Sequence, residues 1–181
     1  MKMNNNNVIA TLASIDRNTL SNEEQLHLDL FMMSYFTGGS TIYELASLMD
    51  EEMCDDYLVV ERFESELSAY TPVDNTIKEI VSRYKADCHF TYILPVFNES
   101  HNTHELRLRR SDEVVVEVNT TLRKLALNAG IEGFISIGST RRLFVETLLG
   151  QLVSFEEISR LAGCYEEEVD MYCKLMLKHA I

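Results

Sequence analysis

The sequence contains few of the residues that interrupt helices and none of the long apolar runs that cross membranes. Its 181 residues include only two prolines and seven glycines, while 46% of them are hydrophobic. This balance is typical of a helix-rich folded protein, long enough for one domain or two small ones with a sizeable core. The opening MKMNNNN does not resemble a signal peptide. We therefore expect a protein outside the membrane.

Cysteine is scarce, and its spacing differs from that of structural zinc sites. The chain has Cys54, Cys88, Cys164 and Cys173, and even the last two are separated by eight residues. Structural zinc sites take their cysteines from much closer pairs. Free thiols in a reducing cytoplasm are the simpler interpretation. We expect a cytoplasmic protein with no metal and no other cofactor.

Basic residues are also few, which argues against unaided binding to a phosphate backbone. The formal net charge is −13. Residues 1–76 hold three basic and fourteen acidic side chains, a net of −11, whereas residues 77–181 hold thirteen and fifteen, a net of −2. The first part suits a basic protein partner and the second can tolerate nucleic acid.

The hydrophobic pattern predicts a mainly α protein of the α+β class, with a small antiparallel sheet or β-arm between two helical units. Three segments are expected: an acidic helical unit (1–72), a helix with the sheet (73–118) and a C-terminal helical unit (119–181). Helical spacing or capping signals predict helices at 8–15, 21–36, 41–48, 50–70, 76–85, 120–129, 139–150, 154–162 and 166–178. Aromatic, β-branched or alternating residues predict strands at 89–97, 105–110 and 114–118.

The helix–turn–helix hairpin predicted at 139–161 is similar in sequence to a segment near the N-terminus. At a constant offset of 113 residues, Leu12 matches Leu125 and residues 30–31 match residues 143–144. Two helical units of similar sequence, packed about a pseudo-twofold axis, would explain this similarity. Common apolar spacing in amphipathic helices is the alternative explanation.

No constellation in the sequence predicts an active site. The His-x-Thr patterns at His89 and His101 match those of two-histidine phosphoesterases, but they are twelve residues apart rather than on distant strands. His101, His104 and Glu105 form only a weak metal pattern. There is no glycine-rich phosphate loop and no Gly-x-Ser-x-Gly. We therefore predict that the protein is not an enzyme, with a nucleotide-handling enzyme built on His89 and His101 as a remote alternative.

The C-terminal third resembles a known family. Segments 118–126 (VNTTLRKLA), 133–138 (GFISIG) and 154–162 (SFEEISRLA) are similar to FlhD, the helical subunit of the bacterial flagellar master activator. The resemblance implies a transcription activator subunit that forms a homodimer. It would reach DNA through a complex, with an FlhC-like zinc-containing DNA-binding subunit and RNA polymerase as partners.

Two sets of contact residues follow from these interpretations. The residues expected to face DNA or a partner are Arg107, Arg109, Arg110, Arg141 and Arg142. Arg141 and Arg142 stand at a helix start, where the helix dipole disfavours cations, which favours a carboxylate or phosphate partner; two solvated side chains are the simpler alternative.

The second functional hypothesis is an acidic adaptor or inhibitor that binds a basic protein surface. Its contact face would be Asp50, Glu51, Glu52, Asp55, Asp56, Glu61, Glu64 and Glu66.

Overall fold

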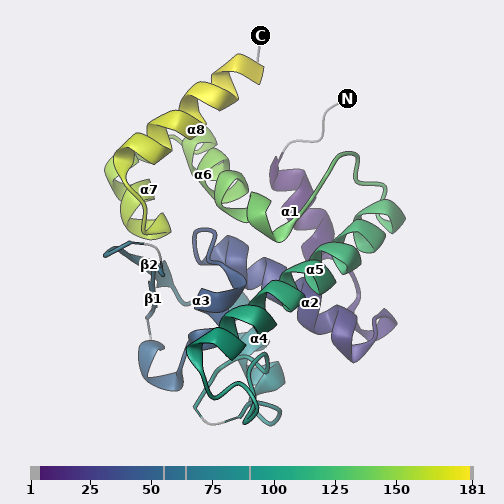
Figure 1. The fold of residues 1–181 in the computed structure, drawn as a ribbon. Coiled ribbons are helices and arrows are strands. Elements are labelled where there is room, and N and C mark those ends of the chain that lie inside the picture. The colour runs from purple at the N-terminus through teal and green to yellow at the C-terminus, as the bar shows by residue number, and fades with distance from the viewer. Residues whose placement is uncertain (1–4, 55, 64, 90, 180–181) are drawn as a thin grey trace.

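The computed structural model describes residues 5–54, 56–63, 65–89 and 91–179. In these ranges the chain forms eight α-helices, three short 3-10 helices and one two-stranded antiparallel sheet (Figure 1). The α-helices are α1 (Asn5–Ala13), α2 (Asn22–Phe36), α3 (Ile42–Ser47), α4 (Asn75–Tyr84), α5 (His104–Asn128), α6 (Thr140–Gly150), α7 (Phe155–Ala162) and α8 (Glu166–His179). The other elements are η1 (Arg17–Thr19), η2 (Asp50–Glu52), η3 (Ile137–Ser139), β1 (Tyr57–Glu61) and β2 (Ser68–Pro72). The predicted fold class, mainly α with a small antiparallel sheet, is confirmed.

Polar side chains define where the predicted helices begin. Ser21 caps α2 and Thr41 caps α3, each in a reciprocal capping box with a glutamate three residues on. Ser154 accepts a hydrogen bond from the backbone N–H of Glu157 at the start of α7. These bonds satisfy amide groups that have no partner inside the helix. The hairpin of α6 and α7 is therefore formed as the sequence predicts.

The sheet forms from residues 57–72, so the helix predicted over 50–70 is wrong. β1 pairs with β2 from Tyr57↔Pro72 to Glu61↔Ser68. Leu58 and Val60 on β1 are buried, as are two alternate residues on β2. The apolar period here is two residues, which is the period of a half-buried strand. Two predicted members of the acidic face, Asp55 and Glu64, lie outside the described residues.

The strands predicted at 105–110 and 114–118 are also wrong, because both segments belong to α5, a helix of 25 residues. Val114, Val118, Leu122 and Leu125 are buried at helical spacing along one face of α5. The segment 89–97 forms no strand in its described part. Its apolar side chains, such as Leu94 and Phe97, are buried beneath turns, and one isolated bridge joins Met49 to Tyr92.

The buried apolar side chains form two clusters. The larger one gathers residues from helices α1 to α5, from both strands, from the loops after α4 and α5 and from the first turn of α6, and the smaller one lies among α6, α7 and α8. Figure 1 shows α5 crossing the molecule, with α6, α7 and α8 grouped on one side and β1–β2 next to α7. The division into segments 1–72, 73–118 and 119–181 stays a prediction, as does the internal repeat. None of the helices in the described ranges is long and apolar enough to cross a membrane.

Candidate functional site

A cavity of about 540 Å³ lies where four parts of the fold meet. These parts are the turn between α2 and α3, the middle of α5, the segment that leads into α6, and the first half of α8. The lining residues are Gly39, Ser40, Thr41, Ile42, Val115, Asn119, Ser136, Ile137, Gly138, Thr140, Arg141, Glu168 and Tyr172. Residues more than a hundred positions apart in the sequence thus share one cavity.

The turn between α2 and α3 approaches its neighbours so closely that it needs glycine. Gly38 and Gly39 have φ of +70° and +86°, a region that L side chains rarely adopt. A Cβ on Gly39 would overlap the backbone and Cβ of Arg141, and a Cβ on Gly38 would overlap Ala162. The two glycines therefore allow the start of α6 and the end of α7 to pack directly on this turn.

The buried Arg62 holds the same turn from the other side. Only 6% of Arg62 is exposed, and its Nη1 lies 3.1 Å from Glu44 Oε2 and 2.8 Å from Ser40 Oγ. Its Nη2 donates to the carbonyl oxygens of Thr37, at 2.9 Å, and of Ala162. Burial lowers the pKa of Arg62, and the adjacent Glu44 carboxylate opposes this shift. This one guanidinium joins the β1–β2 hairpin, the turn between α2 and α3, and the end of α7. It therefore fixes one wall of the cavity.

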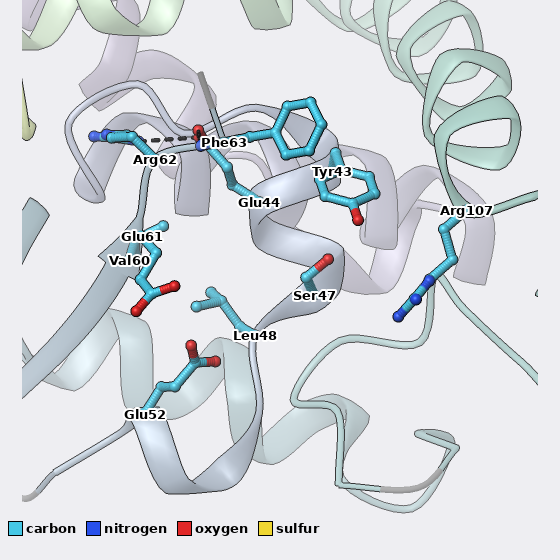
Figure 2. A pocket seen from close by; sticks show the side chains of 10 residues that line it. All are labelled: Tyr43, Glu44, Ser47, Leu48, Glu52, Val60, Glu61, Arg62, Phe63 and Arg107. Atoms are coloured by element: carbon cyan, nitrogen blue, oxygen red, sulfur yellow. Dashed lines mark hydrogen bonds and ion pairs between the residues drawn. The ribbon is translucent and has the colours of Figure 1, made fainter. Parts of the chain in front are cut away.

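Figure 2 shows the Arg62–Glu44 pair beside a second cavity of about 390 Å³. Glu52 and Glu61 extend into this second cavity, and Arg107 enters it from α5. Ser47 Oγ and Arg107 Nε are buried there without a hydrogen-bond partner. Tyr43 and Ser47 line this cavity with Arg62 and Arg107, but the Tyr43 hydroxyl already lies 3.0 Å from His104 Nδ1 and Arg62 is held by Glu44 and the carbonyl of Thr37. The first cavity is therefore the better candidate for a reaction site.

A network of buried hydroxyl groups holds lining residues of the first cavity in place. Ser34 Oγ lies 2.6 Å from the carbonyl oxygen of Ser40 and 2.7 Å from Thr140 Oγ1, which lies 2.7 Å from the carbonyl oxygen of Ile137. Asn119 Oδ1 accepts a hydrogen bond of 2.8 Å from the backbone N–H of Ile137. This network joins α2, α5 and the start of α6, so it makes this wall of the cavity rigid.

Three side chains carry the chemistry of the cavity: Arg141, Glu168 and Tyr172. Arg141 Nη1 lies 3.3 Å from Glu168 Oε1, and both side chains are partly exposed. Glu168 and Tyr172 are four residues apart on α8, which places them on the same face. Burial raises the pKa of Tyr172, the Glu168 carboxylate adds to this rise, and the Arg141 and Arg142 guanidinium groups oppose it.

Tyr172 is the strongest candidate nucleophile in the cavity. The nearby Cys164 thiol is buried, and burial raises its pKa to about 11. The hydroxyls of Ser40, Thr41 and Ser136 are aliphatic and far less acidic than a phenol. A phenol beside a guanidinium can attack an anionic ester whose charge the guanidinium neutralises.

The structure brings only one of the five predicted arginines into this cavity, namely Arg141. Arg142 is exposed on the same turn of α6. The other three predicted arginines lie on helix α5: Arg107, Arg109 and Arg110. The strand predicted at 105–110 would have placed them on the face of a sheet, so that placement is wrong. Arg109 pairs with Glu113, Arg110 pairs with Glu113 and Glu117, and Arg107 bonds weakly to Tyr92.

The predicted acidic face is not the side of a helix. Its described members lie on η2, on the β1–β2 hairpin and in the adjoining loops. Glu52 accepts a hydrogen bond from the backbone N–H of Met49 and so caps η2. Whether this stretch binds a partner stays a prediction.

The histidines considered for a nucleotide-handling enzyme or a metal site make ordinary local contacts. His101 Nδ1 accepts a hydrogen bond from the backbone N–H of Asn98, His89 lies near Glu99, and His104 contacts Tyr43.

Sequence reasoning missed Glu168 and Tyr172. The helix predicted over 166–178 carries no motif that singles out Tyr172. One signal did indicate an anionic partner, although not which residue: two cations at a helix start favour an anion, and the structure supplies the Glu168 carboxylate at Arg141.

Solved structures share this fold although no protein-family model and no curated protein matches the sequence. The lambda integrase catalytic core aligns over 90% of this chain and 90% of its own, with a TM-score of 0.54 and 14% identity. XerH site-specific recombinase, in a post-cleavage complex with a palindromic difH substrate, aligns over 94% of this chain with a TM-score of 0.65 and 12% identity. XerA recombinase aligns over 93% with a TM-score of 0.58 and 14% identity.

The chain spans about half the length of several of these structures, including 58% of a lambda integrase dimer bound to a COC' core site and 48% of the XerH chain. At such low identities the likeness establishes the fold. It overturns the FlhD-like resemblance, because the fold is that of an integrase catalytic core over nearly the whole chain. The predictions of a non-enzymatic activator subunit and of an acidic adaptor are wrong for the same reason, since the shared fold is the catalytic core of DNA-recombining enzymes.

Proposed function

We propose that this chain acts on DNA as an integrase-like or recombinase-like enzyme, and that the cavity around Arg141 and Tyr172 is its reaction site. The observation that carries the proposal is the Tyr172 phenol in the same cavity as the Arg141 guanidinium, on a fold shared with the lambda integrase catalytic core. A cytoplasmic location and the assembly of more than one copy on DNA belong to the same proposal. A lambda integrase structure of this fold is a tetramer bound to a Holliday junction.

The reaction is an exchange of phosphate esters. The Tyr172 phenol oxygen attacks the phosphorus of a DNA phosphodiester as the phenol loses its proton. A bond between phosphorus and Tyr172 oxygen forms, the bond from phosphorus to one deoxyribose oxygen breaks, and that oxygen takes up a proton. The number of phosphate ester bonds is unchanged, so attack by a deoxyribose hydroxyl on the phosphotyrosine reverses the step and reseals a strand.

Arg141 is the residue that receives the phosphate. A guanidinium can donate two parallel hydrogen bonds to a phosphate, which both neutralises and orients the group. The Glu168 carboxylate contacts one nitrogen of this guanidinium, so an incoming phosphate competes with Glu168. Its departure also removes one of the causes that raise the pKa of Tyr172, which makes the phenol easier to deprotonate.

Contacts outside the cavity would come from the remaining predicted arginines. Arg142 is exposed next to Arg141, whereas Arg109 and Arg110 already pair with carboxylates of their own helix. Arg142 is therefore the main candidate for a flanking phosphate. The net charge of −13 repels DNA, and few arginines are placed to neutralise phosphates, so DNA binding should be weak and should depend only modestly on salt.

A covalent-trapping experiment tests this proposal. The full chain is incubated at low salt with a library of nicked DNA duplexes whose central segment is randomised. Cleavage beside the nick releases a short oligonucleotide. The protein then stays attached to the rest of the DNA, and denaturing electrophoresis detects this adduct. We expect an adduct with the wild type and none with Tyr172→Phe or Arg141→Ala. Tyr165→Phe, at an exposed tyrosine, is the matched control and should keep the adduct. Absence of an adduct with the wild type, or an adduct that survives Tyr172→Phe, would overturn the proposal.

A further inference from the structure

A second cluster of functional groups lies where α2 packs on α5, and the reaction site does not use it. Glu23 and His27 are four residues apart on α2 and share one face. Glu117 faces them from the middle of α5. One nitrogen of His27 and one carboxylate oxygen of each glutamate all lie within 4.8 Å of one another.

The orientation of His27 is set by a residue on the opposite helix. His27 is only 4% exposed, and its Nδ1 lies 2.8 Å from Thr121 Oγ1. Its Nε2 lies 3.7 Å from Glu117 Oε2, which is longer than an ordinary N–H···O hydrogen bond. When Nδ1–H donates to Thr121, Nε2 presents its lone pair to the carboxylates. A metal-binding histidine has this arrangement, with its second nitrogen held by an outer partner.

The charge around the cluster also favours a cation. Burial disfavours the protonated form of His27 and so lowers its pKa, while Glu23 and Glu117 place two carboxylates beside its ring. Arg110 compensates one of them, because its Nη1 and Nη2 lie 3.0 Å and 3.3 Å from the two oxygens of Glu117. Glu23 is exposed and Glu117 is partly exposed, so an ion can enter from solvent.

We propose that His27 Nε2, Glu23 and Glu117 bind a divalent transition-metal ion, of which Zn²⁺ fits best. One imidazole and two carboxylates are ligands that Zn²⁺ accepts, and a water molecule can complete a tetrahedral site. The ion ties α2 to α5; Asn119 of α5 lines the reaction cavity, and Ser34 of α2 bonds to its lining residue Thr140. The sequence alone predicted no metal site, because Glu117 is ninety residues from His27. The proposal is independent of the activity on DNA.

The test uses the full chain, freed of metal with a chelator and titrated with Co²⁺ as a spectroscopic substitute for Zn²⁺. We expect one equivalent of Co²⁺ to bind with the visible absorption of nitrogen and oxygen ligands, and Zn²⁺ to displace it. His27→Gln should abolish binding, and Thr121→Val should weaken it by about tenfold or more. Glu23→Gln, at an exposed position, should weaken binding without disturbing the fold. His104→Gln, at an exposed histidine of α5, is the matched control and should bind like the wild type.

Three results would overturn the proposal. The first is a wild type that binds no Co²⁺. The second is binding that neither His27→Gln nor Glu23→Gln weakens, which would assign the ion elsewhere. The third is a strong near-ultraviolet band from thiolate ligands, which would assign the ion to the cysteines. If His27→Gln fails to fold, Glu23→Gln decides alone.

Discussion

The Arg141 guanidinium lies 3.3 Å from the Glu168 carboxylate and so joins the first turn of α6 to the first turn of α8. Two arginines at the start of α6 oppose the positive end of the helix dipole, and Glu168 compensates one of them. The pair leaves the reaction cavity with one cation and one anion on its wall. A phosphate that binds Arg141 therefore competes with Glu168.

Removing the charge of Glu168 should strengthen DNA binding. We expect Glu168→Gln to raise the affinity for duplex DNA at low salt by about fivefold, because a partly exposed ion pair is worth about 1 kcal/mol at most. The matched control is Glu167→Gln, which makes the same change of net charge at an exposed position on α8. Fluorescence anisotropy with a labelled duplex measures both. Equal gains for the two variants would show that net charge, and not the Arg141 pair, limits binding.

Arg62 should be among the residues that contribute most to stability. Arg62→Met leaves Glu44 buried without its partner, and such a change typically lowers the free energy of unfolding by about 3–5 kcal/mol. Arg109→Met is the control, since Arg109 is exposed and pairs only along its own helix, and it should cost less than about 1 kcal/mol. Urea denaturation measures both variants. Similar losses would refute the structural role of the Arg62 network.

The turn that supports Arg141 should tolerate no side chain at Gly39. Gly39→Ala combines a positive φ with an overlap against Arg141, whereas Gly133→Ala has a positive φ and open space around it. We expect Gly133→Ala to cost about 1–2 kcal/mol from backbone strain and Gly39→Ala to cost about 1–3 kcal/mol more from overpacking. The same Gly39 variant should lose DNA binding, because the start of α6 is displaced. Equal destabilisation by the two variants would contradict the close packing.

His27 should make the metal-free protein less stable in mild acid. Its folded pKa lies below the ordinary value of 6.5 because of burial, a shift that Arg110 supports and that Glu23 and Glu117 oppose. Below pH 6.5 the unfolded chain therefore binds the proton more readily than the folded one, so the stability contributed by neutral His27 falls with falling pH.

The measurement is the free energy of unfolding between about pH 8 and pH 5, compared with His27→Gln. The wild type should lose more stability than the variant across this range. A wild type that loses less than the variant would mean that His27 is protonated in the folded chain.

Local signals in the sequence predicted the ends of many helices but not the position of the sheet. Ser21, Thr41 and Ser154 cap helices as expected, since capping depends on residues only three positions apart. The alternation of leucine and arginine over 105–110, followed by three valines, indicated strands. The 25-residue helix α5 prevails there because its buried face packs along α2 and α3. Tertiary packing overrides weak β propensity in this segment.

The sequence predicted part of the candidate site, namely Arg141, but not Tyr172. The unfavourable placement of Arg141 at a helix start indicated an anionic partner, and that inference came from local electrostatics alone. Tyr172 could not be found in this way, because its role depends on the packing of α8 against α6 and on the Gly38–Gly39 turn. Distant residues that form one cavity leave no periodic or motif signal when each element is ordinary by itself.

The most direct measurement of the central claim is the intact mass of the protein after incubation with the nicked duplex library, followed by peptide mapping. The proposed reaction predicts a mass increase equal to one cleaved oligonucleotide strand, carried by the peptide that contains Tyr172 as a phosphotyrosine ester. An unchanged mass, or an adduct on Tyr165 or on a cysteine, would contradict the assignment of Tyr172 as the nucleophile.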